Sequence, residues 1–378
     1  MLRILATTSA HARSINGLAA ADLGGTTVIC SASYDGNVRL WRLEPGPLLC
    51  PLGTVSDDSA GAGAVFSVAA STQADGLVVC AGSHSREIRA WRCAIEAGQL
   101  ILRKEFTSTA HTGWVRALAV NVDSAPSSTL YSVGCNRILG WSLADASTQF
   151  PSARPADSET AVFETDSAAD IAASRSHDIL CLAHSHQMLG SGSVDGAIRT
   201  WSTGDLAPGA ALPEQLARWQ GHADRVAALA WRRHTLLSAG YDGLVRSWRR
   251  PRIGDDSSAE TAWELMAEQQ VATGEGTTGR ALSLAVSPSG QILCGTSAGE
   301  LLALSSDELD IQSRVVLPDA AGMQRVTAIA AIPTRGEPCR GEQGIAAAAS
   351  QAEASTEHKH GSLFVAAGSL GQLHVVEA

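Results

Sequence analysis

The stretch at residues 221–248 reads GHADRVAALAWRRHTLLSAGYDGLVRSW and contains three strand patterns in succession. Residues 226–231 form a period-two run, which is typical of a buried strand. A second apolar run ends at Gly240, and the turn signal Tyr-Asp-Gly then precedes a third run that ends at Trp248. Three consecutive short strands form a meander, and a single meander cannot bury its own faces. The stretch therefore predicts neighbours of the same kind.

The rest of the chain repeats this meander. Four further copies have a third strand that ends in Trp, and two weaker copies have one that ends in an aliphatic residue. The segments that carry the turn and third strand lie at residues 34–41, 84–91, 135–141, 194–201, 297–304 and 369–376. Together with the first stretch they make seven copies at intervals of roughly 40 to 60 residues, a period that indicates a repeat architecture.

A Gly-His pair, an Asp-Gly turn and a strand ending in Trp resemble the WD-repeat family of β-propellers. The resemblance covers nearly the whole chain. It implies an all-β fold, a seven-bladed β-propeller of four-stranded antiparallel blades, in a single domain at residues 1–378. The implied blades lie near residues 11–41, 64–91, 111–141, 177–201, 221–248, 279–304 and 325–376. We expect the inserts at residues 144–176 and 333–361 to be flexible.

The N-terminal segment at residues 2–10 aligns with the outer strand that leads into the fifth copy. Because the chain ends on the third strand of the seventh copy, we expect this segment to complete the last blade and close the ring. An organelle transit peptide stays open as an alternative, because the first 20 residues hold Arg3 and Arg13 and no acid. The expected location is otherwise the cytoplasm or the nucleus.

In the WD-repeat family a His, a strand hydroxyl, the turn Asp and the Trp form a hydrogen-bonded tetrad inside the blade. The resemblance implies two complete structural tetrads in this chain: His11, Ser31, Asp35, Trp41 and His222, Ser238, Asp242, Trp248. The fourth copy keeps the other three residues, with His177 as its candidate His. The sixth and seventh copies lack both the Asp and the Trp, so we expect apolar packing to hold those blades.

Composition excludes several classes of function. The formal charge of −10 weighs against nucleic acid as a partner. Eight cysteines without a C-x-x-C pair indicate a reducing compartment and no metal site, and no apolar run is long enough to span a membrane. The sequence matches no phosphate loop, nucleophile elbow or dinucleotide fingerprint, so we expect no enzyme, no catalytic residue and no cofactor.

The candidate partner-binding residues follow from alignment of the copies. The residue before each first strand should project onto one face of the disc, and in the last three copies this residue is Arg. The residue before the turn Asp should lie on the same face. The candidates are Arg225, Arg280, Arg325, Trp114, Tyr34, Tyr241 and His84. This composition is that of a binding hot spot, and guanidinium groups suit an acidic or phosphorylated peptide. The alternative is that these residues are scattered over the solvated surface.

The expected function is that of a non-catalytic protein–protein interaction scaffold, a monomeric propeller within a multiprotein assembly. One alternative is a substrate receptor of a ubiquitin ligase, although the Trp-Asp-x-Arg box of some such receptors is missing at all five strand-end Trp positions. Another is an enzyme with a site in the central channel. The inner strands offer few candidates for such a site apart from His177 and Asp178.

Overall fold

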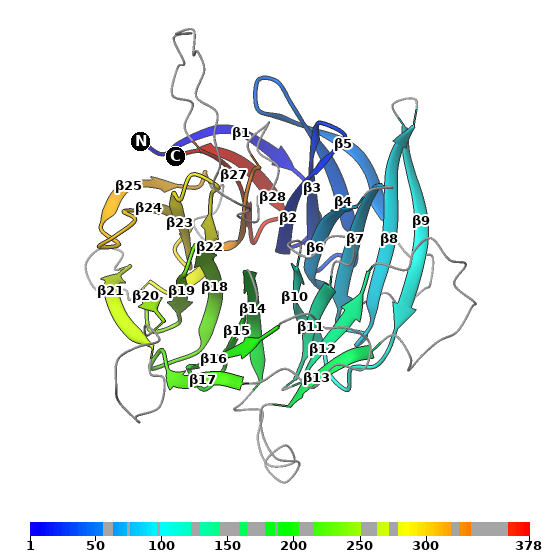
Figure 1. Ribbon diagram of the computed structural model, residues 1–378. Coiled ribbons are helices and arrows are strands. Elements are labelled where there is room, and N and C mark those ends of the chain that lie inside the picture. The colour runs from blue at the N-terminus through cyan, green and yellow to red at the C-terminus, as the bar shows by residue number, and fades with distance from the viewer. Residues whose placement is uncertain are drawn as a thin grey trace, which may run out of the picture.

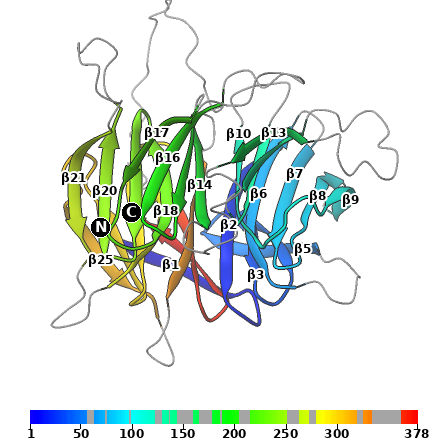
Figure 2. The same ribbon diagram turned by 90° about the horizontal axis from the view of Figure 1, so that it is seen from below.

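The computed structural model of the chain describes residues 1–55, 63–73, 76–96, 99–121, 129–135, 137–143, 159–164, 178–185, 188–203, 215–250, 263–271, 279–318, 325–333 and 362–378. Within these ranges the regular elements are β-strands, numbered β1 to β28. They form seven four-stranded antiparallel sheets arranged around a central axis, as Figure 1 shows along that axis and Figure 2 from the side. The predicted all-β, seven-bladed propeller is thereby confirmed.

Each of the first six blades follows the chain from its inner to its outer strand. Blade 1 contains β2 (Ile15–Leu23), β3 (Thr26–Ser33), β4 (Val38–Glu44) and β5 (Leu48–Val55). Blade 2 contains β6 (Val65–Gln73), β7 (Gly76–Ser83), β8 (Ile88–Glu96) and β9 (Gln99–Ser108). Blade 3 contains β10 (Val115–Asn121), β11 (Thr129–Gly134), β12 (Arg137–Ser142) and β13 (Glu159–Glu164).

The remaining blades have the same order. Blade 4 contains β14 (Ile179–Ser185), β15 (Met188–Ser193), β16 (Ala197–Ser202) and β17 (Gln215–Gln220). Blade 5 contains β18 (Val226–Arg232), β19 (Thr235–Gly240), β20 (Leu244–Arg249) and β21 (Glu264–Gln270). Blade 6 contains β22 (Ala281–Val286), β23 (Ile292–Thr296), β24 (Glu300–Leu304) and β25 (Ile311–Val316). Blade 7 contains β26 (Val326–Ala331), β27 (Leu363–Gly368), β28 (Gln372–Glu377) and β1 (Arg3–Ser9).

The ring closes through blade 7, where β1 pairs antiparallel with β28 from Arg3 opposite Glu377 to Ser9 opposite Gln372. This confirms the predicted closure by the N-terminal strand. The side chains of Arg3 and Glu377 form an ion pair at 2.8 Å, and both ends of the chain lie at this blade (Figure 1). Because β1 covers the outer edge of β28, the last blade has the same four strands as its neighbours.

The core lies between neighbouring blades. Seven clusters of buried apolar side chains fill the seven interfaces, and each cluster draws on two adjacent blades. In the sixth and seventh blades Leu304 and Val376 stand at the position of the strand-end Trp and are buried in these clusters. Each inner strand packs against the inner strands on both sides, so its small apolar side chains face a neighbour and not water.

Every inner strand contains a β-bulge directly after its first residue, where the pairing register with the second strand shifts. The shifts lie, for example, between Val65 and Ser67 in β6 and between Val115 and Ala117 in β10. A bulge redirects the side chain of the extra residue. The extra residues are Asn16, Phe66, Arg116, Leu180, Ala227, Leu282 and Thr327.

The two predicted inserts lie largely outside the described residues. Within 144–176 the structure describes only β13, whose Val162 and Phe163 pair with strand β12 as the outer strand of blade 3. Residues 334–361 of the second insert are not among the described ranges. None of the described elements is a helix long and apolar enough to cross a membrane.

Candidate functional site

Blade 5 contains a chain of hydrogen bonds through the four residues of its implied tetrad. Trp248 Nε1 donates to Ser238 Oγ at 2.8 Å, Ser238 Oγ lies 2.8 Å from His222 Nε2, and His222 Nδ1 lies 2.9 Å from Asp242 Oδ1. With the imidazole neutral and Nδ1 carrying the proton, every one of these groups has a partner. Blade 1 repeats the chain with Trp41, Ser31, His11 and Asp35 at 2.8 to 2.9 Å.

Burial sets the charge of these tetrads. It lowers the pKa of the His222 imidazole below its ordinary value, against the opposing effect of the Asp242 hydrogen bond. Burial alone would raise the pKa of Asp242, but the hydrogen bond from His222 and the backbone donors outweigh it, so that this pKa is lowered. The same directions hold for His11 and Asp35. At neutral pH each tetrad therefore contains a neutral imidazole and an ionised carboxylate, which stabilises the blade and leaves neither group exposed for catalysis.

Blade 3 keeps part of the tetrad. His111 Nε2 lies 2.8 Å from Ser132 Oγ, which accepts a hydrogen bond from Trp141 Nε1 at 2.7 Å. The turn Asp is missing, and the buried Nδ1 of His111 has no hydrogen-bond partner among the described residues. Burial, assisted by the charge of Arg137, lowers the pKa of His111 to about 4. In blade 4 Trp201 Nε1 donates to Ser191 Oγ at 3.3 Å, and the candidate His177 lies outside the described residues.

The two sets of candidate face positions lie side by side. The backbone N–H of the residue before the turn Asp donates to the carbonyl of the residue before the first strand: Tyr34 to Ser14, His84 to Ala64, Val194 to Asp178 and Tyr241 to Arg225, at 2.8 to 2.9 Å. Ser297 and Ser369 bond to Arg280 and Arg325 in the same way at 2.9 and 3.0 Å. The inner strands all begin at this end of the blades, so these residues share one face of the disc.

An aromatic cluster extends over blades 1 to 3 on this face. Phe66 lies at its centre, with ring centroids 5.5 Å from Tyr34, 6.2 Å from His84 and 5.7 Å from Trp114. The His84 and Trp114 rings are 4.6 Å apart, and the Arg116 guanidinium lies 4.9 Å from the Trp114 ring. Tyr34 is 44% exposed and Trp114 is 40% exposed, so both present aromatic surface to a partner.

An arginine cluster lies on blades 5 and 6. The guanidinium groups of Arg280 and Arg225 lie 4.9 Å and 5.8 Å from the centre of the Tyr241 ring. Both arginines are exposed, and Tyr241 is partly buried beneath them. Cation–π contacts hold the two guanidinium groups over the ring. The arginine side chains therefore have less conformational freedom to lose when a ligand binds.

Arg325 connects the two clusters around the ring. It is exposed and directly precedes the inner strand β26, which packs between β22 of blade 6 and β2 of blade 1. The predicted residues therefore follow one arc across six blades, in the spatial order Trp114, His84, Tyr34, Arg325, Arg280 and then Tyr241 with Arg225. Blade 4 interrupts this arc, because the equivalent positions there hold Asp178 and Val194.

In the part of the chain that the structure describes, several acidic side chains near the arc make contacts with other parts of the protein. Asp35 and Asp242 bond to the tetrad histidines, and Glu87 forms an ion pair with Arg89 on the same strand. Asp224 accepts a hydrogen bond from the backbone of Arg225 at 2.7 Å. Among the described residues the arc thus presents the exposed arginines Arg225, Arg280 and Arg325, with Asp224 as an exposed acid beside Arg225.

Phe66 and Arg116 are members of the site that sequence reasoning did not find. Both are the extra residue of a β-bulge, so the period-two pattern assigns their side chains to the wrong side of the strand. A usable signal is their place two residues after the face positions Ala64 and Trp114. Within the described residues no group of three or more His, Cys, Asp or Glu side chains could hold a metal ion.

Two parts of the chain, residues 2–42 and 213–249, match the family model described as WD domain, G-beta repeat. The chain is also similar to a solved structure, the crystal structure of the WD40 beta propeller domain of Doa1, with a TM-score of 0.65 at 14% sequence identity. That match covers 100% of this chain and 97% of the other, and at this identity it shows the fold. No curated protein matches the sequence.

The two matched repeats and the seven-bladed fold support a relation to the WD-repeat β-propellers. Propellers of this family generally mediate protein–protein interactions and are typically non-catalytic scaffolds.

Proposed function

We propose that the chain is a non-catalytic interaction platform that binds an acidic or phosphorylated peptide of a protein partner along the arc. The observation that carries the proposal is the ordered pair Arg225 and Arg280, held over Tyr241 on one face of a rigid disc. Arginine in this arrangement offers two planar forks to carboxylate or phosphate oxygens. The rigid blades beneath fix the distance between the forks and so limit the entropy lost on binding.

The aromatic cluster supplies the second half of the surface. Exposed Tyr and Trp side chains are frequent anchors of protein interfaces, because they bury a large area at a small entropic cost. Tyr34 and Trp114 therefore suit an apolar or aromatic residue that precedes or follows the acidic part of the peptide. The partner peptide then carries both kinds of residue, spaced to span from blade 5 or 6 through blade 7 to blades 1 to 3.

The test measures affinity for a fluorescent pool of peptides rich in Asp, Glu and phosphoserine, with a pool in which Lys replaces the acids as reference. We expect the double change Arg225→Glu, Arg280→Glu to weaken binding of the acidic pool about tenfold or more, because it removes charge-assisted hydrogen bonds and adds repulsion. Affinity should also fall as salt is added.

The control is Arg249→Glu on β20, which changes the charge of blade 5 as Arg225→Glu does and is compared with that single change. Arg249 is exposed and paired with Glu264 at 2.8 Å on the outer half of the blade, so its replacement should leave affinity unchanged. Equal binding by the wild type and the double variant would contradict the proposal. If Arg249→Glu also loses binding, the loss reflects net charge and not contacts at the arc. Trp114→Ala tests the aromatic half separately.

A further inference from the structure

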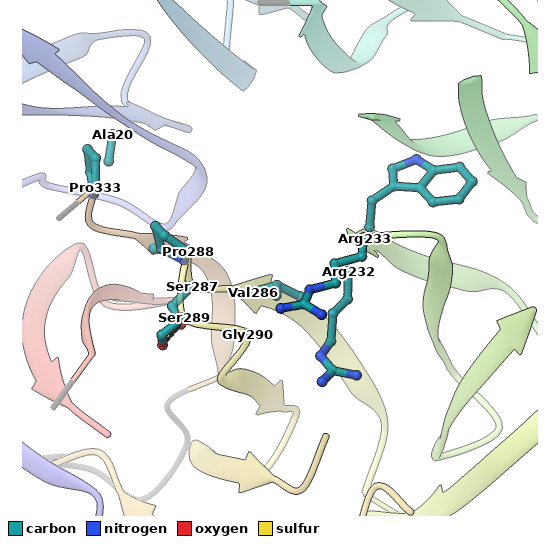
Figure 3. A pocket seen from close by; sticks show the side chains of 11 residues that line it. Ala20, Arg232, Arg233, Val286, Ser287, Pro288, Ser289, Gly290 and Pro333 are labelled. Carbon is teal, nitrogen blue, oxygen red and sulfur yellow. Dashed lines mark hydrogen bonds between the residues drawn. The ribbon is translucent and has the colours of Figure 1, made fainter. Parts of the chain in front are cut away.

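A pocket of about 350 Å³ opens at the far ends of the inner strands. It is lined by the ends of β18, β22 and β26 and by Ala20 of β2, from four different blades. Figure 3 shows the Arg232 and Arg233 side chains extending from the end of β18, across from the turn at Ser287–Gly290 and from Pro333. Because the inner strands begin at the arc, their far ends place this pocket on the opposite face of the disc.

Only part of the Arg232 guanidinium makes hydrogen bonds within the described part of the chain. Its Nη1 donates to the carbonyl of Ser306 at 2.8 Å and lies 3.9 Å from Asp307 Oδ1. Its Nε is buried and has no hydrogen-bond partner among the described residues. A Cβ built on Gly290 would lie 3.4 Å from Nε and 3.9 Å from Nη2, so the Nε side of the guanidinium packs against Gly290. Nη2, for which no hydrogen bond is found among the described residues, is the nitrogen left for a ligand.

The surroundings of Nη2 also suit an anion. Arg233 is exposed in the tight turn after β18, at a positive φ of 53°, and no ion pair of its guanidinium is found among the described residues. On the opposite wall the hydroxyls of Ser287 and Ser289 are linked at 2.8 Å. The nearest acid to Arg232, Asp307, has a side chain that is 89% exposed, and water screens much of its charge.

From this geometry we infer that the pocket binds a phosphate monoester, carried on a soluble metabolite or on a lipid headgroup. Arg232 donates to a phosphate oxygen through Nη2, Arg233 supplies a second positive charge, and Ser289, whose hydroxyl is shared with Ser287 and Ser362, lies across the pocket. The volume is at the lower end of the range for small-molecule sites, which fits a single phosphorylated sugar. The inference does not depend on peptide binding at the arc, because the two sites lie on opposite faces.

The experiment titrates the full chain with glucose 6-phosphate, with glucose as reference, and with phosphatidylcholine vesicles that contain or lack phosphatidylinositol phosphate. We expect Arg232→Gln to weaken phosphate binding about tenfold or more. Arg232→Lys keeps the charge but loses the guanidinium donor Nη2, and it should weaken binding less than Arg232→Gln does. Arg233→Gln, at an exposed turn, gives a second variant that does not disturb buried groups. Arg249→Gln is the matched control and should bind like the wild type.

The two arms identify the source of the phosphate. Binding of glucose 6-phosphate that is lost in Arg232→Gln assigns the pocket to soluble phosphates, and vesicle binding that needs both the lipid phosphate and Arg232 assigns it to a headgroup. The inference is overturned if neither probe binds, if glucose binds as well as its phosphate, or if Arg232→Gln and Arg233→Gln both bind like the wild type while remaining folded by circular dichroism.

Discussion

At the scale of single residues, the most informative group is the Ser238 hydroxyl. It lies between two buried side chains, accepting from Trp248 and lying 2.8 Å from His222 Nε2. The tetrad thus connects β20, through Trp248, and β19, through Ser238, to the segment before β18 that contains His222. Blades 6 and 7 dispense with it and bury Leu304 and Val376 instead, which shows that apolar packing can hold the same backbone.

We expect Ser238→Ala to lower the free energy of unfolding by about 2 to 4 kcal/mol, because two buried polar groups lose their partner at once. Chemical denaturation followed by Trp fluorescence measures the change. The exposed Ser306→Ala provides a reference, with an expected change within about 0.5 kcal/mol. Similar effects of the two changes would show that the tetrad contributes little to stability.

A second prediction for single residues concerns how the stability of the fold depends on pH. Burial lowers the pKa of His111 and of His374 to about 4 each, whereas an unfolded chain has a histidine pKa near 6.5. Between about pH 4 and 6.5 the unfolded state therefore binds more protons than the folded state. The stability that the neutral, buried imidazoles contribute is complete above about pH 6.5 and is lost as pH falls toward about 4. The melting temperature should fall over that window.

The variant His111→Gln separates the contribution of one group. It should melt below the wild type at neutral pH, and the gap should narrow as pH falls, because the variant has no imidazole to protonate there. Parallel curves for the two proteins across the window would show that His111 does not contribute to the acid sensitivity.

At the scale of elements, the bulges explain what the sequence could and could not predict. Strand order, the Asp-Gly turns and the face of Arg225 and Tyr241 follow from local pattern, because turn chemistry and strand-end residues fix them. The bulge after each first residue is not visible in the alternation of apolar residues. Phe66 and Arg116 were missed for this reason, although they complete the aromatic cluster.

The outer strands were also hard to predict. Outer strands such as β9 and β21 are largely exposed, so neither face is consistently apolar and the period-two signal is weak. The pocket beside Arg232 was not predicted either, because it is formed by the ends of β18, β22 and β26, which are far apart in the sequence. The packing of β18 of blade 5 against β22 of blade 6 brings Arg232 opposite Ser287 and Gly290.

At the scale of the whole molecule, ring closure depends on one strand. Leu2, directly before β1, is buried between blades 6 and 7, and the hydroxyl of Thr7 on β1 lies 2.9 Å from His374 Nδ1. Without β1 the backbone groups of β28 would form an open edge, and such edges pair with other chains.

We expect removal of residues 1–9 to lower the melting temperature and to cause self-association, as measured by differential scanning calorimetry and light scattering. A synthetic peptide of residues 1–10 added in trans should restore both toward the values of the intact chain, because it can reoccupy the edge of β28. A truncated chain that melts like the intact one and stays monomeric would contradict this role of β1.

The pairing of β1 with β28 also determines how the molecule responds to mechanical force. Arg3 lies opposite Glu377, so the two ends of the chain leave the sheet side by side. A force that pulls these ends apart acts on the first hydrogen bonds of the pair and then breaks the rest one after another, as in unzipping, and not all at once, as in shear. The propeller should therefore open at blade 7 under a small load when it is pulled by its ends, while the other six blades stay intact.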